Sequence, residues 1–460
     1  MLDISLVRAS SDKARANLAK RQDDEVLKNF DLFVEQDKEW RSKLQELEKQ
    51  KAARNVLTQQ INEAKQQKKE FDSLILQARE LGAQIQQNEK RVSELRLSLD
   101  QLAQRMPNLL HDSVPFGKSD VDNKVVRKWG KEFKPKFELQ HHGALAVKLG
   151  IADFEGAVKI SGEGFYILKG PLALLNNALQ QLAIEMLVKK GFQLVNPPLM
   201  VRHKAMDVVT SLDAFEDMLY KVQDHDLYLI ATSEHPIGSM LSGQVFNAEQ
   251  LPLKFAGISP CFRKEVGKHG LDERGLFRVH QFDKVEQFVY CTPEQSWKLH
   301  EELIANAEQF MKALKIPYRI VNVCTGDIGI VAAKKYDVEG WSPREQKYIE
   351  LCSASNCTTW QSIRANVKFR KGEDKQYVHT LNATMVATPR VLRLILENFQ
   401  QKDGSVKIPA ALHKYMHGVK TLELPKPKAG KPKEKPKAKF KPKTKAKVKA
   451  KSAQNSKKKR

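Results

Sequence analysis

The sequence predicts an α+β protein in which a long antiparallel helical hairpin precedes a domain of mixed strands and helices. No proline occurs before Pro107, and residues 27–104 are rich in Leu, Gln, Glu, Lys, Arg and Ala, which are good helix formers. By contrast, residues 261–288 contain two stretches with the period of two that is typical of β-strands. We therefore expect three parts, comprising residues 1–106, 107–424 and 425–460.

A heptad repeat runs through the second half of the helical stretch. Its positions step alternately by four and three residues, with one polar interruption at Asn88: Leu74, Ala78, Leu81, Ile85, Asn88, Val92, Leu95, Leu99 and Leu102. A less regular seam precedes it at Trp40, Leu44, Leu47, Leu57 and Ile61. The polar segment 64–70 is the best candidate for a reversal, so two helices of about 35 residues should form a coiled-coil hairpin roughly 50 Å long. Dimerisation through the heptads is the alternative role for this arm.

A helix followed by a strand is expected near the middle of the chain. Gly170 and Pro171 should start the helix, because proline is favoured in a first helical turn. Residues 192–195 then have the character of a strand, which two prolines stop. The apolar stripe of the helix comprises Leu175, Leu179, Leu182 and Met186.

The two extended segments of residues 261–288 place charged side chains on one face. Arg263 and Glu265 share a face by strand parity, while Val279 and Val285 should point away from the charged face of the returning strand. Guanidinium groups suit phosphate oxygens, an aromatic ring can stack on a purine, and a carboxylate accepts from an amine. These types point to an activated nucleotide, although an amphipathic hairpin with a solvated face would look similar. The charged face of the returning strand comprises Arg278, His280, Phe282, Lys284 and Glu286.

Composition indicates a soluble, cytoplasmic protein with no membrane partner. Of the 460 residues, 41% are hydrophobic and 29% are charged, as in globular proteins. No apolar run approaches the ~20 residues needed to cross a bilayer, and Asp3 and Arg8 interrupt the N-terminus where a signal peptide would be apolar. The five cysteines are an odd number, so reduced thiols are expected, and the spacing of Cys352 and Cys357 fits a zinc site poorly.

The net charge of +23 is concentrated at the C-terminus. Residues 425–460 carry 17 Lys and Arg against the single Glu434, and Phe440 is their one aromatic residue. Such a stretch cannot bury enough apolar surface to fold alone, so we expect a disordered tail. It would attract RNA by neutralising phosphates, and a solubilising tail or a localisation signal is an equal alternative.

Several segments resemble one enzyme family in its own order. Phe262, Arg263, Lys264 and Glu265 resemble the F-R-x-E signature of motif 2 in class II aminoacyl-tRNA synthetases, and RVHQFDKVEQF is similar to the seryl-tRNA synthetases in particular. The resemblance covers residues 1–424. Further similar segments are MLDISLVRA, PNLLHDSVPFG, ATSEHP, TGDIGIVAAKKYDVEGW, ELCSASNCTTWQ and TLNATMVATPR.

This resemblance implies an N-terminal tRNA-binding domain with a helical arm and a class II catalytic domain, built on an antiparallel sheet with flanking helices. It implies a ligase that activates L-serine with ATP and transfers the seryl group to tRNA(Ser), with tRNA(Sec) as a further candidate. The arm would bind the long variable arm of the tRNA, with basic residues such as Lys65 near its tip. The segment from Pro171 to Pro198 resembles motif 1, which builds the homodimer interface in this family.

The resemblance also assigns a nucleotide site, and the chain lacks the GxxxxGK[ST] and GxGxxG loops of other nucleotide folds. Arg263 would bind the α-phosphate, Glu265 the adenine amino group and Phe282 the adenine ring. Arg278 would lie near the distal phosphates. The expected ATP ligands are Arg263, Lys264, Glu265, Arg278, Val279, Phe282, Glu350, Leu351, Cys352, Ser353 and Arg390, with Arg263 and Arg390 as the catalytic pair.

The stretch NATMVATPR resembles motif 3 of the family, but it lacks the glycines that most class II sequences carry there. Thr388 should cap a helix and Pro389 should occupy its first turn, which directs Arg390 toward the nucleotide. Glu350 and Ser353 match the family's Mg²⁺ ligands, and a lone Glu at a strand end is otherwise a solvated carboxylate.

The resemblance places a serine pocket beside the nucleotide. Glu286 would bind the ammonium group of serine, and Thr384 would meet its hydroxyl. Because an analogue without the hydroxyl leaves polar groups unpaired, alanine should be rejected. The expected serine ligands are Thr232, Ser233, Glu234, Arg263, Glu286, Asn382 and Thr384.

Three other functions would leave different sequences. A synthetase-like paralogue that acts as an RNA-binding or regulatory module should have lost ATP ligands or the arm. An enzyme that loads an aminoacyl group onto a carrier protein should lack the arm. A coiled-coil scaffold explains residues 27–104 alone. The presence of both the arm and the expected ATP ligands favours the tRNA ligase.

Overall fold

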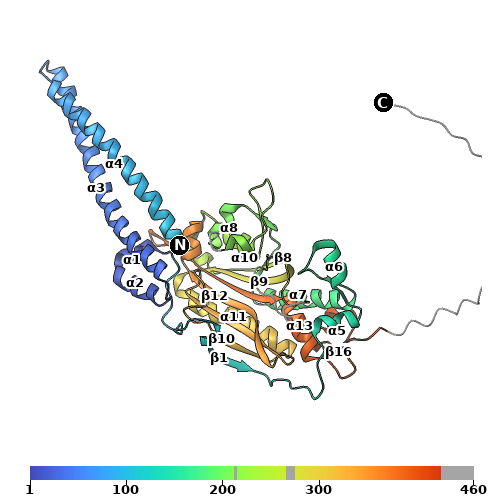
Figure 1. Ribbon diagram of the computed structural model, residues 1–460. Helices are drawn as coiled ribbons and strands as arrows, with labels where there is room; N and C mark the ends of the chain where they lie inside the picture. The colour runs from blue at the N-terminus through green and yellow to red at the C-terminus, as the bar shows by residue number, and fades with distance from the viewer. Residues whose placement is uncertain (212–214, 266–274, 426–460) are drawn as a thin grey trace, which may run out of the picture. The chain divides into compact units, whose positions relative to one another are not determined.

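The computed structural model describes residues 1–211, 215–265 and 275–425. Its main features are a pair of long N-terminal helices and a large sheet packed against helices, which confirms the predicted α+β class (Figure 1). Residues 1–424 form one compact unit, so the boundary at residue 106 stays a prediction. The predicted disordered tail lies outside the described residues, apart from Pro425.

The predicted helical hairpin is confirmed, with arms of 43 and 34 residues. The N-terminal helices are α1 (Ile4–Ala9), α2 (Ser11–Ala19), α3 (Asp24–Gln66) and α4 (Asp72–Arg105). α3 begins where the Asp23 carboxylate accepts from the backbone N–H groups of Glu25 and Val26, which satisfies donors of the first turn. It is followed by a turn in which Lys68 has a φ of 52°, inside the predicted reversal at 64–70. α3 and α4 then run alongside each other (Figure 1).

The residues of the predicted heptad seam are buried or half-buried. Ile85 and Leu95 are buried, and so is the polar position Asn88. The Asn88 amide donates to the Glu46 carboxylate and to the Gln50 side-chain oxygen, both at 2.9 Å. The one polar residue of the seam is therefore hydrogen-bonded rather than stranded. At the base of the arm, α1 and α2 join it through an apolar cluster comprising Leu2, Val7, Ala14, Leu18, Phe30, Phe33, Leu99, Ala103 and Met106.

An eight-stranded sheet forms the centre of the larger part. Its strand order is β1-β10-β11-β12-β15-β9-β8-β4. All neighbours are antiparallel except β4 and β8, which confirms the expected antiparallel sheet. The strands are β1 (Lys124–Trp129), β4 (Gln193–Val195), β8 (Leu253–Phe262), β9 (Gln281–Cys291), β10 (Tyr318–Asn322), β11 (Lys334–Ser342), β12 (Lys347–Thr358) and β15 (His379–Ala387).

The two faces of the sheet pack against different helices. Val285 and Val289 of β9 belong to the main apolar core, together with residues of α7 (Pro171–Val188), α11 (Pro293–Leu314) and α13 (Thr388–Asn398). Phe288 and Tyr290 belong to a second core with residues of α8 (His203–Val209), α10 (Glu234–Ser239) and α12 (Trp360–Ala365). Successive residues of β9 thus face opposite sides, as the period of two predicts.

The predicted helix and strand near the middle of the chain are confirmed. α7 begins at Pro171 after Gly170, whose φ of 50° suits a residue without a Cβ. The predicted stripe is buried in, or packs against, the main core. β4 follows and pairs in parallel with β8 at the edge of the sheet.

The remaining elements are short. The other helices among the described residues are α5 (His142–Lys148), α6 (Phe154–Ser161) and 3-10 turns at Asp120–Asp122, Glu216–Met218, Ala248–Gln250 and Ala410–Tyr415. Small sheets contain β2 (Ala152–Asp153), β3 (Ile167–Leu168), β5 (Met200–Val201), β6 (Tyr228–Leu229), β7 (Val245–Asn247), β13 (Lys368–Lys371), β14 (Asp374–Tyr377), β16 (Val406–Lys407) and β17 (Thr421–Leu422). All five cysteines are free and buried, as expected. Within the described ranges, no helix combines the length and apolar character needed to cross a membrane.

Candidate active site

A cavity of about 170 Å³ lies on the polar side of β9 and β15. Lys284 and Glu286 of β9 reach it because they alternate with the core residue Val285. Most of the residues expected from the sequence line this cavity together. They are Thr232, Glu234, Arg263, Glu265, Arg278, Val279, Phe282, Glu286, Glu350, Leu351, Cys352, Ser353, Asn382, Thr384 and Arg390.

A buried carboxylate forms the floor at one end of the cavity. Glu286 is 2% exposed and lies directly opposite Thr384 in the ladder between β9 and β15. Its Oε2 accepts from the Thr384 hydroxyl at 3.0 Å and lies 2.6 Å from Lys284 Nζ. A single oxygen therefore receives both a hydroxyl and an ammonium group.

A second carboxylate, Glu234, lies at the start of α10 beside the first. Burial and the neighbouring charge of Glu286 raise the pKa of Glu234 to about 7. Gln361 and Asn382 each donate a side-chain N–H to its Oε1, at 2.8 and 3.0 Å. Lys284 and Arg263 supply positive charge near the two carboxylates, and Glu234 keeps a proton that it can release when a cation binds beside it.

Arg263 and Phe282 form the other end of the cavity. Arg263 follows the last residue of β8, and its Cζ lies 5.3 Å from the centre of the Phe282 ring. Its Nε donates to the Ala231 carbonyl at 3.3 Å, which holds the guanidinium in place. A fixed guanidinium beside an open aromatic ring can take a phosphate and a planar base.

Two further ion pairs line the cavity. Arg278 lies 3.0 Å from the Glu265 carboxylate. Arg390 lies 3.3 Å from the Glu350 carboxylate and donates to the Glu350 backbone carbonyl at 2.9 Å. A bound polyanion can compete with these partly exposed carboxylates for both arginines, so the pairs keep the guanidinium groups in reach of the cavity.

The start of α13 differs from the sequence prediction in one detail. The N-cap residue is Ala387, and Thr388 is the first helical residue. The Thr388 hydroxyl donates to the Asp283 carbonyl at 3.2 Å instead of capping the helix, because the helix starts where β15 ends and packs beside β9. The predicted cap is therefore wrong, whereas Pro389 lies in the first turn and Arg390 lines the cavity as expected.

Strand parity fails outside the strands. Residues before Gln281 are irregular, so Val279 lines the cavity instead of pointing away. His280 was expected on the cavity face, but it stacks on Phe165 and hydrogen-bonds Tyr220 elsewhere. Both parity predictions are wrong because a period of two holds only for extended backbone.

Two of the expected ligands do not line the cavity. Ser233 is fully buried and packs so closely on β8 that a Cβ on Gly257 would lie 2.4 Å from its hydroxyl oxygen. The ammonium group of Lys264 lies 5.7 Å from the centre of the Tyr220 ring. A sequence motif covers consecutive residues, but neighbouring side chains can point in different directions. Ser233 and Lys264 therefore belong to matching motifs without lining the cavity.

Four other residues line the cavity and were not expected to act as ligands: Phe277, Lys284, Ala387 and Pro389. Lys284 was placed on the correct face by parity, which was the signal that could have identified it. Phe277 follows the irregular segment after Gly275, and no periodic pattern marks such a position. Its placement depends on contacts with α13, where Arg390 Cζ lies 5.6 Å from its ring centre.

Glu350 and Ser353 of β12 are suited to hold Mg²⁺. Burial opposes the ionisation of Glu350, but Arg390 and Lys335 lower its pKa overall, so its oxygens are charged donors. Asp337 lies opposite Ser353 in the ladder, and its Oδ1 is a buried oxygen with no hydrogen-bond partner among the described residues. Magnesium accepts few protein oxygens and takes its other ligands from water and phosphate, so these donors fit.

Comparisons with known proteins identify the family that the chain resembles along most of its length. Residues 1–110 match the model of the seryl-tRNA synthetase N-terminal domain, and residues 218–399 match the class II tRNA synthetase core domain (G, H, P, S and T). A serine–tRNA ligase of Methanocella arvoryzae is 51% identical over 92% of this chain and 100% of its own length.

Two solved structures are similar along most of their length. The seryl-tRNA synthetase of Pyrococcus horikoshii complexed with ATP has a TM-score of 0.89 and 44% identity, covering 93% of this chain and 100% of that one. The cytoplasmic serine–tRNA ligase of Naegleria fowleri in complex with AMP has a TM-score of 0.81 and 34% identity, covering 89% and 95%.

Proposed function

Because this chain belongs to the seryl-tRNA synthetase family, we propose that it activates L-serine with ATP and transfers the seryl group to tRNA(Ser). The observation that carries this proposal is the division of one cavity into a guanidinium–aromatic half and a carboxylate half. The first half suits an adenylate, and the second suits an amino acid with an ammonium and a hydroxyl group.

The nucleotide half binds ATP through complementary groups. Phe282 stacks on the adenine, Glu265 accepts from its amino group, and Arg263 binds the α-phosphate. Arg278 exchanges its partner Glu265 for the distal phosphates. Val279, Leu351 and Cys352 are further parts of the wall.

The carboxylate half binds serine. The ammonium group of serine lies between Glu234 and Glu286 and relieves their mutual repulsion. The serine hydroxyl meets the Thr384 hydroxyl, which now donates to Glu286. Thr232 and Asn382 complete the wall. Alanine would leave these polar groups unpaired, and a polar site rejects such an analogue strongly.

Glu350 and Ser353 would hold Mg²⁺, which supplies positive charge to the triphosphate when bound. The protein's own contribution to the reaction is positioning and charge. The serine carboxylate attacks the α-phosphorus, a P–O bond forms, and pyrophosphate leaves. Arg263 and Arg390 neutralise the phosphate charge that would repel the carboxylate. The tRNA terminal hydroxyl then attacks the seryl carbonyl and AMP leaves.

The helical arm would contact tRNA(Ser), with tRNA(Sec) as a second candidate substrate. α7 and β4 would form the interface of a homodimer, since they correspond to the motif 1 unit. A cytoplasmic location fits the cytoplasmic label of the Naegleria relative. The basic residues 425–460 would add a salt-dependent attraction to RNA.

The proposal is tested by replacing Arg263 with alanine. Serine-dependent exchange of pyrophosphate into ATP should be lost, because the α-phosphate loses its main fixed charge. Arg319→Ala is a matched control, since Arg319 pairs with Glu339 elsewhere on the sheet. Near-normal exchange by the Arg263→Ala protein would overturn the assignment.

A further inference from the structure

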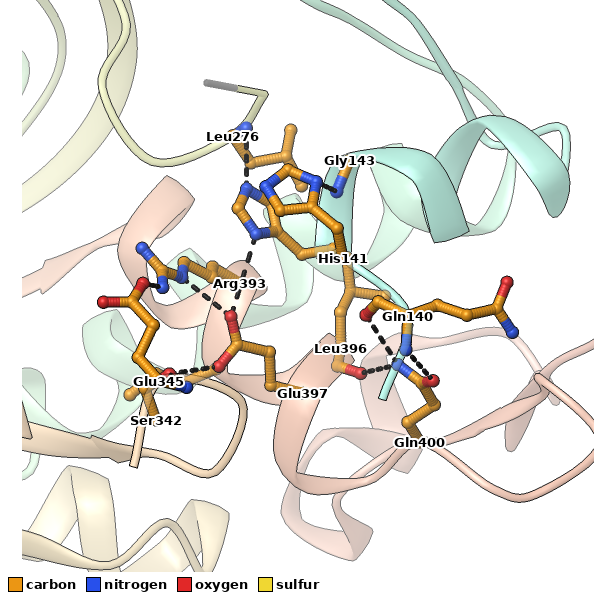
Figure 2. A network of polar contacts seen from close by, with 12 residues as sticks. Gln140, His141, Gly143, Leu276, Ser342, Glu345, Arg393, Leu396, Glu397 and Gln400 are labelled. Atoms are coloured by element: carbon orange, nitrogen blue, oxygen red, sulfur yellow. Dashed lines mark hydrogen bonds and ion pairs between the residues drawn. The ribbon is translucent and has the colours of Figure 1, made fainter. Parts of the chain in front are cut away.

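A buried polar network lies at the edge of the proposed ATP site. Glu397 of α13 is fully buried and accepts from the Ser342 hydroxyl at 2.5 Å and from Arg393 Nε at 2.8 Å (Figure 2). Arg393, which is 1% exposed, also pairs with Glu345. A buried ion pair is often no more stabilising than apolar residues of the same volume. The charges therefore call for an explanation other than stability.

His142, the first residue of α5, connects this network to the segment that enters β9. Its Nε2 accepts from the Leu276 backbone N–H at 3.4 Å. In a neutral ring the proton then lies on Nδ1, which faces Glu397 Oε1 at 3.7 Å. The approach is close, because a Cβ on Gly275 would lie 3.1 Å from His142 Nε2. Glycine at position 275, with a φ of 84°, permits this contact.

The start of α5 is itself fastened to the end of α13. The Gln140 N–H donates to the Gln400 side-chain oxygen at 2.8 Å, and Gln400 Nε2 donates back to the Gln140 carbonyl at 3.2 Å (Figure 2). α5 and α13 therefore form one platform on which Leu276 rests.

A ring contact makes the second connection. The Cζ atoms of Arg393 and Arg390 lie 4.5 and 5.6 Å from the centre of the Phe277 ring. Arg393 is fixed by its buried carboxylates, whereas Arg390 lines the cavity. Arg278 is the next residue after Phe277, so both contacts flank the proposed ligand of the distal phosphates.

We infer that His142 and Glu397 are positioning residues for ATP, holding Arg278 and Arg390 in place through the Leu276 N–H group and the Phe277 ring. Neither residue lines the cavity, so both act through other groups. This role rests on the proposed ATP site and extends it to a buried network that no motif marks.

Two matched substitutions separate positioning from stability. In His142→Gln the side-chain amide reaches the place of Nε2 and can still accept from Leu276. In His142→Asn the amide reaches only the place of Nδ1, so the bond to Leu276 is lost. We expect His142→Asn to raise the KM for ATP in pyrophosphate exchange roughly 3- to 10-fold, which is the effect of one net hydrogen bond. In His142→Gln the KM for ATP should stay close to the wild-type value. The KM for serine should stay within about twofold in both.

Hydrogen–deuterium exchange measures the hydrogen bond between Leu276 N–H and His142 without any need for catalysis. Peptides that cover residues 275–280 should exchange faster in His142→Asn than in His142→Gln, while peptides of α7 should not change. His379→Ala, which removes a half-buried imidazole bonded to Ser296 away from the cavity, is the control for a general loss of packing.

The inference fails if His142→Asn leaves both the KM for ATP and the exchange of residues 275–280 unchanged. It also fails if both His142 variants raise the KM for ATP and for serine equally, as a purely structural role predicts. Should His142→Asn not fold, Glu397→Gln keeps the shape of the side chain and removes the charge that faces His142 Nδ1, and it must show the same selective rise in the KM for ATP. If the wild-type protein shows no serine-dependent pyrophosphate exchange, the proposed function is refuted. Hydrogen–deuterium exchange would still show whether His142 holds the Leu276 N–H group.

Discussion

The arm and the cavity bury polar groups in opposite ways. In the arm, the neutral amide of Asn88 is the polar interruption of the seam, and two nearby acceptors satisfy it. In the cavity, Glu234 and Glu286 lie close together, with Lys284 as the adjacent cation. The buried amide of the arm therefore has its hydrogen-bond partners within the arm itself. The cavity retains a carboxyl group of raised pKa, Glu234, whose ionisation a ligand with an ammonium group would favour.

Between the arm and the carboxylate end of the cavity, the largest expected effect comes from removing the charge of Glu286. Glu286→Gln should lower serine-dependent pyrophosphate exchange by about 10²–10³-fold, because the ammonium group loses one partner and Lys284 is left unpaired in a buried site. Measurement of kcat/KM for serine checks this.

A second variant separates the two causes. Glu286→Gln should also lower the free energy of unfolding in urea, because it leaves Lys284 as an unpaired buried cation. Adding Lys284→Met removes this cation and should restore most of the stability, but not the activity. If the double variant regained activity, the carboxylate would have served only to neutralise Lys284.

A smaller effect on pyrophosphate exchange should follow when a buried side chain at the base of the arm is shortened. Leu99 is 3% exposed at the base of the arm, so Leu99→Ala should lower the free energy of unfolding by about 2–5 kcal/mol. Urea unfolding followed by circular dichroism measures this. Pyrophosphate exchange should remain within about twofold, since the arm does not line the cavity. Charging of tRNA(Ser) should fall more than exchange, and an equal fall in both would contradict the separation of the two regions.

The smallest effect concerns pH. The pKa of Glu234 is raised from 4.5 to about 7, so the folded protein binds a proton there that the unfolded chain releases. This group thus favours folding most at low pH and loses that contribution as the pH rises from about 4.5 through 7.

A bound ammonium group reverses the preference and favours ionised Glu234. The affinity for serine should therefore rise between pH 6 and 8, by no more than about tenfold per pH unit because one proton is involved. Calorimetric titration with serine in two buffers of different ionisation enthalpy measures the proton released. Glu234→Gln should remove the proton release, and a pH dependence that survived this change would assign the titration to another group.

Features with a regular period could be predicted from the amino-acid sequence. Absence of proline and a heptad pattern specified the hairpin, because each helical residue turns by the same angle and side chains four and three apart must share a face. Strand parity likewise placed Phe282, Lys284 and Glu286 together on β9, opposite Val285. In these stretches local hydrogen bonding sets the geometry, so it can be predicted without knowledge of distant contacts.

Side-chain positions outside the helices and strands depend on contacts between distant parts of the chain. Val279 turns into the cavity and His280 away from it, since contacts with distant segments replace the strand period there. Thr388 fails to cap α13 because its hydroxyl meets a carbonyl next to β9. The contact of His142 with Leu276 joins residues 134 positions apart. Irregular backbone has no period, so packing between remote parts of the chain sets where such side chains point.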